Sequence, residues 1–320
     1  MSDRAAPWSF AAPWGGASHL ADLDGPVHWV DFGGPPAGPA TVPAVVPAMV
    51  LVHGLGGSHL NWALVAPALS RRARVIAVDP PGFGLTPADG RRTTVAANAR
   101  LLGRFVREVI GAPVILVGNS MGGMVCVLHT GIRPDTVAGL VLVDPSLPVP
   151  LRLPDPRVAA QFLAYAAPVV GERYLSWNRS RQSSRQLVQQ IVDMCFADPS
   201  RATAALLDAA TDLAEHRRTL PEQHAAFVEA ARSLMLVLAR PRRYQALLRA
   251  LEPPVLLVHG ERDRLVPAAA ARAALVGNPR WDSAFLAGVG HTPQLEAPDD
   301  VVHHLTGWLD RHRLAPRRTG

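Results

Sequence analysis

Short runs of apolar residues recur along the chain, and most of them end at a glycine or an aspartate. They are rich in Val, Ile and Leu without polar alternation, which is typical of strands buried on both faces of a parallel sheet. Segments with helical character lie between them, and this alternation predicts a doubly wound α/β sheet. The strand candidates are residues 48–54, 74–82, 113–120, 140–146, 254–263 and 282–288.

The stretch from residue 147 to residue 250 breaks this rhythm, because it holds no clear buried strand. Its candidates are helical and are separated by proline and glycine, at residues 155–170, 185–197 and 221–239. We therefore predict an α/β core made of residues 1–146 and 251–320, with residues 147–250 inserted between two strands as a helical cap.

The composition is that of a globular chain with a sizeable core. Hydrophobic residues make up 48% of the 320 residues and charged residues 18%, which argues against a disordered chain. No apolar run reaches the length of a membrane span. The first residues lack the basic and apolar regions of a secretory signal. We expect a cytoplasmic protein without a membrane span, and the sequence leaves its oligomeric state open.

The charge adds little to this picture. The formal net charge is +6, and all 32 basic residues are arginines. Many of them are scattered or lie near the C-terminus, whereas a nucleic-acid site favours a clustered stripe with interleaved aromatic residues, so we expect no nucleic-acid partner. The two cysteines, Cys126 and Cys195, have neither a disulfide-framework spacing nor a metal-ligand spacing. We predict no metal and no cofactor.

One serine stands out at the end of a predicted strand. Residues 118–122 read Gly-Asn-Ser-Met-Gly and fit the pattern G-x-S-x-G, in which a sharp strand-to-helix turn exposes the serine hydroxyl. The helix that follows would point backbone N–H groups at developing negative charge. The pattern predicts that Ser120 is a nucleophile.

A serine hydroxyl needs a base, and the base needs an acid that fixes its tautomer. Of the twelve histidines, His291 follows the last strand candidate, and Pro293 and Pro298 after it keep its surroundings loop-like, so we predict it as the base. Asp144 and Asp263 each end a predicted strand. Both fit the chain order serine, acid, histidine, so order does not choose between them.

The same chemistry needs backbone donors for an oxyanion. The segment His53–Gly57, His-Gly-Leu-Gly-Gly, follows a predicted strand, and its small residues allow its amides to face the site. We predict that Leu55 and Met121 supply the two N–H groups, and that His53 holds the loop.

These motifs together resemble the α/β-hydrolase superfamily, in its cap-bearing branch. The resemblance covers residues 26–146 and 250–312 and rests on HGLGGSHLNW, VIAVDPPGFGLT, LVGNSMGG, LLVHGERDRLVP and GVGHTPQLEAP. It implies an eight-stranded, mostly parallel sheet and a cap inserted after the sixth strand. It also favours Asp263 over Asp144 as the acid.

The resemblance narrows the function to three hypotheses. Dehalogenases and epoxide hydrolases of this fold have aspartate where this chain has Ser120, so we expect a serine hydrolase acting on a small carboxylic ester. GNSMGG also resembles the meta-cleavage C–C hydrolases, although Thr292 follows the histidine where those have tryptophan. A ligand-sensing receptor of this fold is the third. The predicted pocket residues are Trp62, Phe162 and Trp177.

Overall fold

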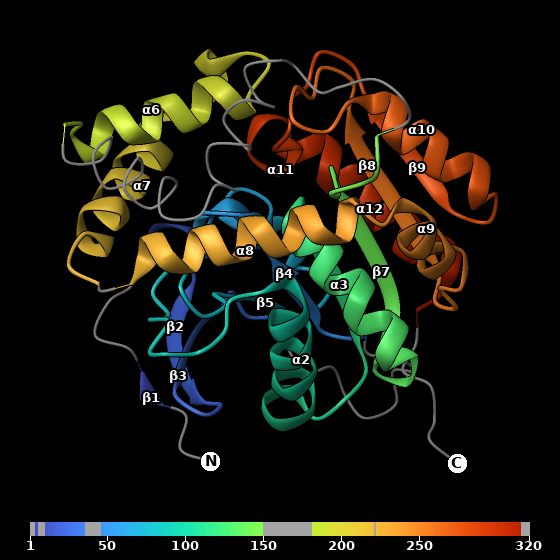
Figure 1. The fold of residues 1–320 in the computed structure, drawn as a ribbon, viewed down its shortest axis with the longest axis horizontal. Coiled ribbons are helices and arrows are strands. Elements are labelled where there is room, and N and C mark those ends of the chain that lie inside the picture. The colour runs from blue at the N-terminus through green and yellow to red at the C-terminus, as the bar shows by residue number, and fades with distance from the viewer. Residues whose placement is uncertain (1–3, 6–9, 36–45, 150–180, 221, 315–320) are drawn as a thin grey trace.

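The computed structural model describes residues 4–5, 10–35, 46–149, 181–220 and 222–314. In this part of the chain one sheet has nine strands, ordered β1-β2-β3-β5-β4-β6-β7-β8-β9 (Figure 1). Along this order, the pairs from β1 to β5 are antiparallel, and the pairs from β5 to β9, which include β4, are parallel. The strands are β1 (Arg4–Ala5), β2 (Ala17–Asp22), β3 (Pro26–Asp31), β4 (Met49–Val52), β5 (Val75–Val78), β6 (Val114–Asn119), β7 (Val137–Val143), β8 (Val255–Gly260) and β9 (Asp282–Leu286).

The predicted mostly parallel, eight-stranded sheet is confirmed in β2 to β9, and the two-residue β1 extends one edge. The apolar runs predict β4 to β9 but miss β2 and β3. Both of these strands mix polar and apolar residues, and only one position of β2 in three is buried. The local signal was the Asp24-Gly25 pair between them, which favours a hairpin; both residues have positive φ.

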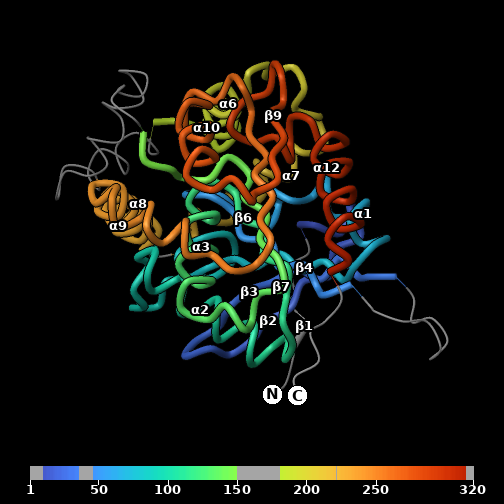
Figure 2. The backbone as a smooth tube through the Cα atoms, turned by 90° about the vertical axis from the view of Figure 1, so that its right-hand side faces the viewer, coloured from blue at the N-terminus to red at the C-terminus, as the bar shows by residue number. Residues whose placement is uncertain are grey.

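Two hydrophobic cores lie on opposite faces of the sheet. In β4, Val50 and Val52 face one core, whereas Met49 and Leu51 face the other. This period of two explains why the central strands are apolar at every position. Helices α2 (Val95–Phe105) and α3 (Met121–Ile132) cover the first face, and α1 (Ala66–Leu69) and α12 (Pro298–His312) the second (Figure 2).

Between β7 and β8, the regular elements of the described residues are all helices, joined by irregular segments. Figure 1 shows α6 and α7 side by side, with α8 crossing in front of the sheet. The remaining helices are α6 (Ser184–Cys195), α7 (Ala204–Arg217), α8 (Gln223–Leu238), α9 (Pro241–Arg249), α10 (Ala268–Gly277) and α11 (Pro293–Glu296). None of the described helices is both long enough and apolar enough to cross a membrane.

Candidate active site

Ser120 occupies a strained turn between β6 and α3. Its φ of 53° and ψ of −118° lie outside the regions that a non-glycine residue prefers, and such strain clusters at functional sites. Its backbone N–H donates to the Val143 carbonyl at 3.1 Å, and its carbonyl accepts from the Ser146 N–H at 3.0 Å. The neighbouring strand β7 therefore holds the turn in this conformation.

The two glycines of the motif allow the turn to pack. A Cβ on Gly118 would lie 2.6 Å from the Gly123 Cα, inside the helix that follows. A Cβ on Gly122 would lie only 2.1 Å from the Val52 carbonyl oxygen at the end of β4. Since backbone atoms cannot move aside as a flexible side chain can, both positions require glycine.

His291 and Asp263 form a buried pair. The His291 Nδ1 lies 2.7 Å from Asp263 Oδ2 and donates to the carboxylate. The other oxygen, Oδ1, accepts from the Leu265 and Val266 amides at 2.7 and 3.0 Å. Burial disfavours the charged carboxylate, but the charge and hydrogen bond of His291 outweigh it and lower the pKa of Asp263. Asp263 is thus an anion that orients the imidazole.

Asp144, the alternative acid, lies beside this pair. The Asp144 and Asp263 carboxylates and the His291 imidazole have polar atoms within 4.8 Å of one another. The Asp144 Oδ1 accepts from the Gly260 N–H at 3.0 Å. Burial first, and then the negative charge of Asp263, raise the pKa of Asp144 well above its usual value. Asp144 is therefore the more readily protonated of the two carboxyls, and its protonated form can donate to the Asp263 carboxylate.

The loop after β4 brings backbone donors close to Ser120. A Cβ on Gly54 would lie 3.1 Å from the Ser120 Cβ, so the loop and the turn are in contact. The Leu55 and Met121 amides donate to no residue of the described part of the chain. Met121 is the first residue of α3, where a free N–H group is expected. Both amides are available to a ligand.

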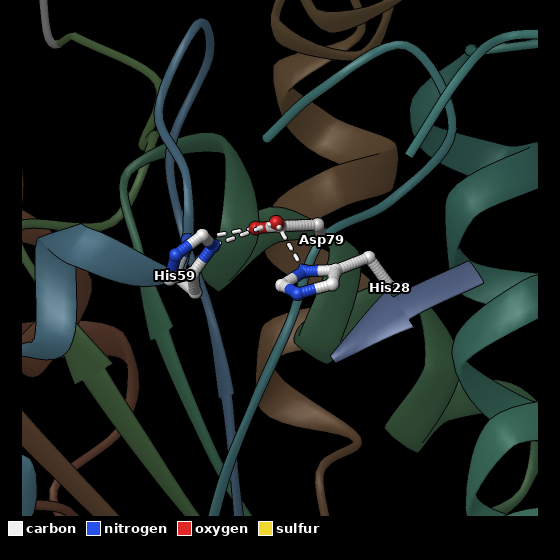
Figure 3. Close-up of side chains that lie close together, drawn as sticks. All are labelled: His28, His59 and Asp79. Atoms are coloured by element: carbon white, nitrogen blue, oxygen red, sulfur yellow. Dashed lines mark hydrogen bonds and ion pairs between the residues drawn. The ribbon is translucent and has the colours of Figure 1, made fainter. Parts of the chain in front are cut away.

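The buried carboxylate of Asp79 holds the chain that follows this loop (Figure 3). Asp79 accepts from the His28 Nδ1 at 2.9 Å and from the His59 Nδ1 at 2.7 Å, and both histidines approach it from opposite sides. It also accepts from the His59 and Leu85 backbone amides. Despite burial, these neighbours hold the pKa of Asp79 well below its usual value. With four donors on the carboxylate, we interpret the cluster as a structural anchor.

His53 completes the anchor. Its Nδ1 donates to the Gly54 carbonyl at 2.7 Å, and its Nε2 lies 3.7 Å from Asp79 Oδ1. Burial lowers the pKa of His53 to about 4, so the ring is neutral at pH 7. His53 therefore holds the loop, as the sequence predicts.

A cavity of about 920 Å³ opens over these residues at the carboxyl ends of the strands. Ser120, His291 and Leu55 line it from the core, and apolar side chains of α6, α7 and α8 line it from the other side. Among the described residues the Ser120 hydroxyl makes no hydrogen bond with His291. Such bonds often tighten only when substrate binds.

The predicted pocket residues fare differently. Trp62 is 1% exposed and belongs to the core on the α12 face, so the structure places it in packing and not in the cavity wall. Phe162 and Trp177 lie outside the described residues. Cys195 does line the cavity, but burial raises the pKa of its thiol to about 12. It stays protonated at neutral pH and is a poor nucleophile.

The sequence reasoning missed the role of Asn119. This side chain is 1% exposed, and its Nδ2 donates to the Val143 carbonyl at 3.0 Å and to the His291 carbonyl at 3.1 Å. It therefore ties the serine turn to the histidine loop across 172 positions of sequence. The sequence shows that Asn119 lies inside the G-x-S-x-G motif, but it does not show which distant loop the side chain contacts.

Comparison with known proteins agrees with this architecture. The model of the Alpha/beta hydrolase family matches residues 49–304. The chain is 30% identical over 266 residues to the dihydrolipoyllysine-residue acetyltransferase component of the acetoin cleaving system of Pseudomonas putida, covering 82% of this chain and 64% of that protein. It therefore spans less than two thirds of that relative's length.

Two further matches cover a larger share of the matched protein. The 2-hydroxy-6-oxononadienedioate/2-hydroxy-6-oxononatrienedioate hydrolase of Escherichia coli is 28% identical over 273 residues, which cover 82% of this chain and 87% of that protein. The crystal structure of Cfl2 from Burkholderia cenocepacia superposes with a TM-score of 0.75 at 22% identity, covering 96% and 99% of the two chains. The chain belongs to the alpha/beta hydrolase family.

Proposed function

We propose that the protein is a serine hydrolase that cleaves carboxylic esters through Ser120, His291 and Asp263. The observation that carries this proposal is the shared site. A strained serine and a carboxylate-oriented histidine line one cavity, beside two backbone amides that donate to no residue of the described ranges. The residues 147–250 would act as the cap that closes this cavity.

The proposed chemistry proceeds through an acyl-enzyme. His291 takes the proton of the Ser120 hydroxyl as the oxygen attacks the ester carbonyl, and the Leu55 and Met121 amides stabilise the oxyanion. The imidazolium, held by Asp263, then protonates the leaving alcohol. In the second half-reaction His291 takes a proton from the water that attacks the acyl-enzyme. The imidazolium then returns this proton to the Ser120 oxygen as the acid is released.

The cavity lining supports an apolar substrate. Its cap side carries Leu187, Ile191, Leu207, Phe227 and Leu234. The lining arginines already bond to the protein. Arg217 donates to the Gly56 carbonyl, Arg218 to the Gln182 carbonyl, and Arg264 to the carbonyls of Asp193 and Phe196. We therefore favour esters with an apolar acyl chain over substrates with several carboxylates.

Ser120→Ala tests this proposal. We expect wild-type protein to hydrolyse p-nitrophenyl butyrate, and the variant to lose at least about three orders of magnitude in kcat, because no acyl-enzyme can form. The alanine removes only the hydroxyl, and a thermal melt checks that the fold is intact. Turnover by the variant at the wild-type rate would refute the assignment.

Hydrolysis of a C–C bond is the second candidate. It is favoured by the similarity to the Escherichia coli hydrolase and by the shared serine in GNSMGG. A 2-hydroxy-6-oxo-dienoate with an apolar 6-substituent discriminates between the two. Faster turnover of this substrate than of any ester in a panel graded by acyl length would favour C–C cleavage. No measurable turnover would exclude it.

A further inference from the structure

The loop that carries His291 touches the chain between β7 and β8 through backbone atoms. The His291 N–H donates to the Cys195 carbonyl at 2.6 Å. A Cβ on Gly290 would lie 2.3 Å from that same oxygen and 2.7 Å from the Ala197 nitrogen. The histidine loop is therefore in direct contact with the end of α6, which lines the cavity.

One buried carboxylate joins these two segments. Glu296, at the end of α11, is 5% exposed. Its Oε2 accepts from the Gly290 N–H at 2.7 Å and the Ala197 N–H at 3.0 Å. Its Oε1 accepts from the Asp198 N–H at 2.9 Å and lies 3.3 Å from the Arg201 Nη1. Each oxygen thus has two donors, and Arg201 balances the charge.

A second, separate contact holds α6 to the core. The Arg264 Nη2 donates to the Asp193 and Phe196 carbonyls, both at 2.6 Å. A cation at a helix C-terminus is favourable there. Because this contact does not involve the histidine loop, α6 stays anchored when Glu296 is changed. A change at Glu296 therefore leaves this anchor of the cavity wall in place.

We propose that Glu296 is a positioning residue that sets the place of His291 by bonding Gly290, Ala197 and Asp198 at once. The inference rests on the proposed function, because the position of His291 affects turnover only if this residue is the base. Glu296 itself does not line the cavity. It acts through the backbone N–H of Gly290, the residue before the histidine.

Glu296→Gln is the variant that tests the proposal. An amide has one oxygen, so its NH₂ group must face backbone N–H donors on one of the two sides, and at least one pair of bonds is lost. We expect kcat for p-nitrophenyl butyrate to fall about 10- to 100-fold, since a small misplacement of a catalytic group has effects of this size. We expect KM to change less than about threefold, because α6 keeps its Arg264 anchor.

Glu229→Gln is the matched control. Glu229 on α8 accepts from the Thr93 N–H and hydroxyl at 2.7 and 2.8 Å and pairs with Arg92, and it does not line the cavity. It therefore joins an inserted helix to the core in a similar way, but it forms none of these bonds with the histidine loop. We expect this variant to lower the melting temperature and to leave kcat at the wild-type value.

A second readout separates positioning from general loosening. A small fluorophosphonate reacts with an activated serine without filling the cavity, so its rate reports the Ser120–His291 geometry. We expect this rate to fall with kcat in Glu296→Gln only. If Glu296→Gln folds and keeps wild-type kcat and phosphonylation rates, the proposal is wrong. If Ser120→Ala stays active, the proposed function itself fails, which is a different result.

Arg201→Ala serves if Glu296→Gln does not fold. The Arg201 side chain is 40% exposed, so its loss should be tolerated. The change removes the only charged partner of Glu296 among the described residues and also the Arg201 bond to the Gly288 carbonyl, at 3.2 Å, in the same loop. We expect a several-fold decrease in kcat and in the phosphonylation rate with KM unchanged. Wild-type rates in this variant would overturn the proposal.

Discussion

At the scale of single residues, two aspartates with the same place in the sequence pattern have pKa values shifted in opposite directions. Both end a strand, and chain order could not separate them. The structure separates them because Asp263 receives the His291 Nδ1 and two amides, whereas Asp144 receives the Gly260 amide and faces the Asp263 charge. Such a difference arises from contacts across the sheet, which no local pattern encodes.

This difference predicts unequal effects on activity. Asp263→Asn should lower kcat by about four orders of magnitude, since the amide favours the wrong histidine tautomer. Asp144→Asn should leave kcat close to wild type, because asparagine can still donate to Asp263 and accept from Gly260. Steady-state kinetics on an ester substrate check both. Equal losses in the two variants would contradict the assignment of Asp263 as the acid.

The raised pKa of Asp144 also predicts how stability depends on pH. A carboxyl whose folded pKa exceeds its unfolded value gives stability that is fully present below the unfolded pKa, about 3.9, and is lost as the pH rises through the folded pKa. Asparagine does not ionise. The free energy of unfolding of Asp144→Asn relative to wild type, measured with urea, should therefore increase with pH. A difference that stays constant between pH 5 and pH 9 would contradict the raised pKa of Asp144.

At the scale of elements, the serine turn depends on the close approach of α3 to β4. The sequence predicted this strand-turn-helix because its glycines are local. It also predicted that His53 holds the next loop. It could not predict Asn119 or Glu296 in their roles, because the bonds of these side chains run to segments about a hundred or more positions away.

Gly122→Ala tests the packing of the turn. Its Cβ would meet the Val52 carbonyl oxygen, a backbone atom that cannot give way, so we expect a loss of about 3 kcal/mol in the free energy of unfolding. Gly307→Ala in α12 is the control, since its Cβ would meet only the flexible end of Arg311 at 3.5 Å. That change should stabilise by about 0.5–1 kcal/mol. Chemical denaturation gives both values, and a neutral Gly122→Ala would contradict this packing.

At the scale of the whole molecule, the strands were easiest to predict where both faces of the sheet are buried. The central strands β4 to β8 bury both faces, so continuous apolar runs revealed them. The edge strand β9 was predicted as well, although only two of its five positions are buried. The antiparallel edge was missed because β2 and β3 do not form such runs. Trp62 was expected in the pocket but packs in the core facing α12. A position in a loop after a strand does not determine whether the side chain points into the cavity or into the core.

The central claim is that Ser120 carries the acyl group during turnover. It is tested most directly by rapid acid quench of the protein with p-nitrophenyl butyrate, followed by peptide mass spectrometry. We predict a butyryl adduct on the peptide that contains Ser120, formed in a burst with p-nitrophenol and absent from Ser120→Ala. Ester hydrolysis with no adduct on Ser120, or with the adduct on another residue, would contradict the account.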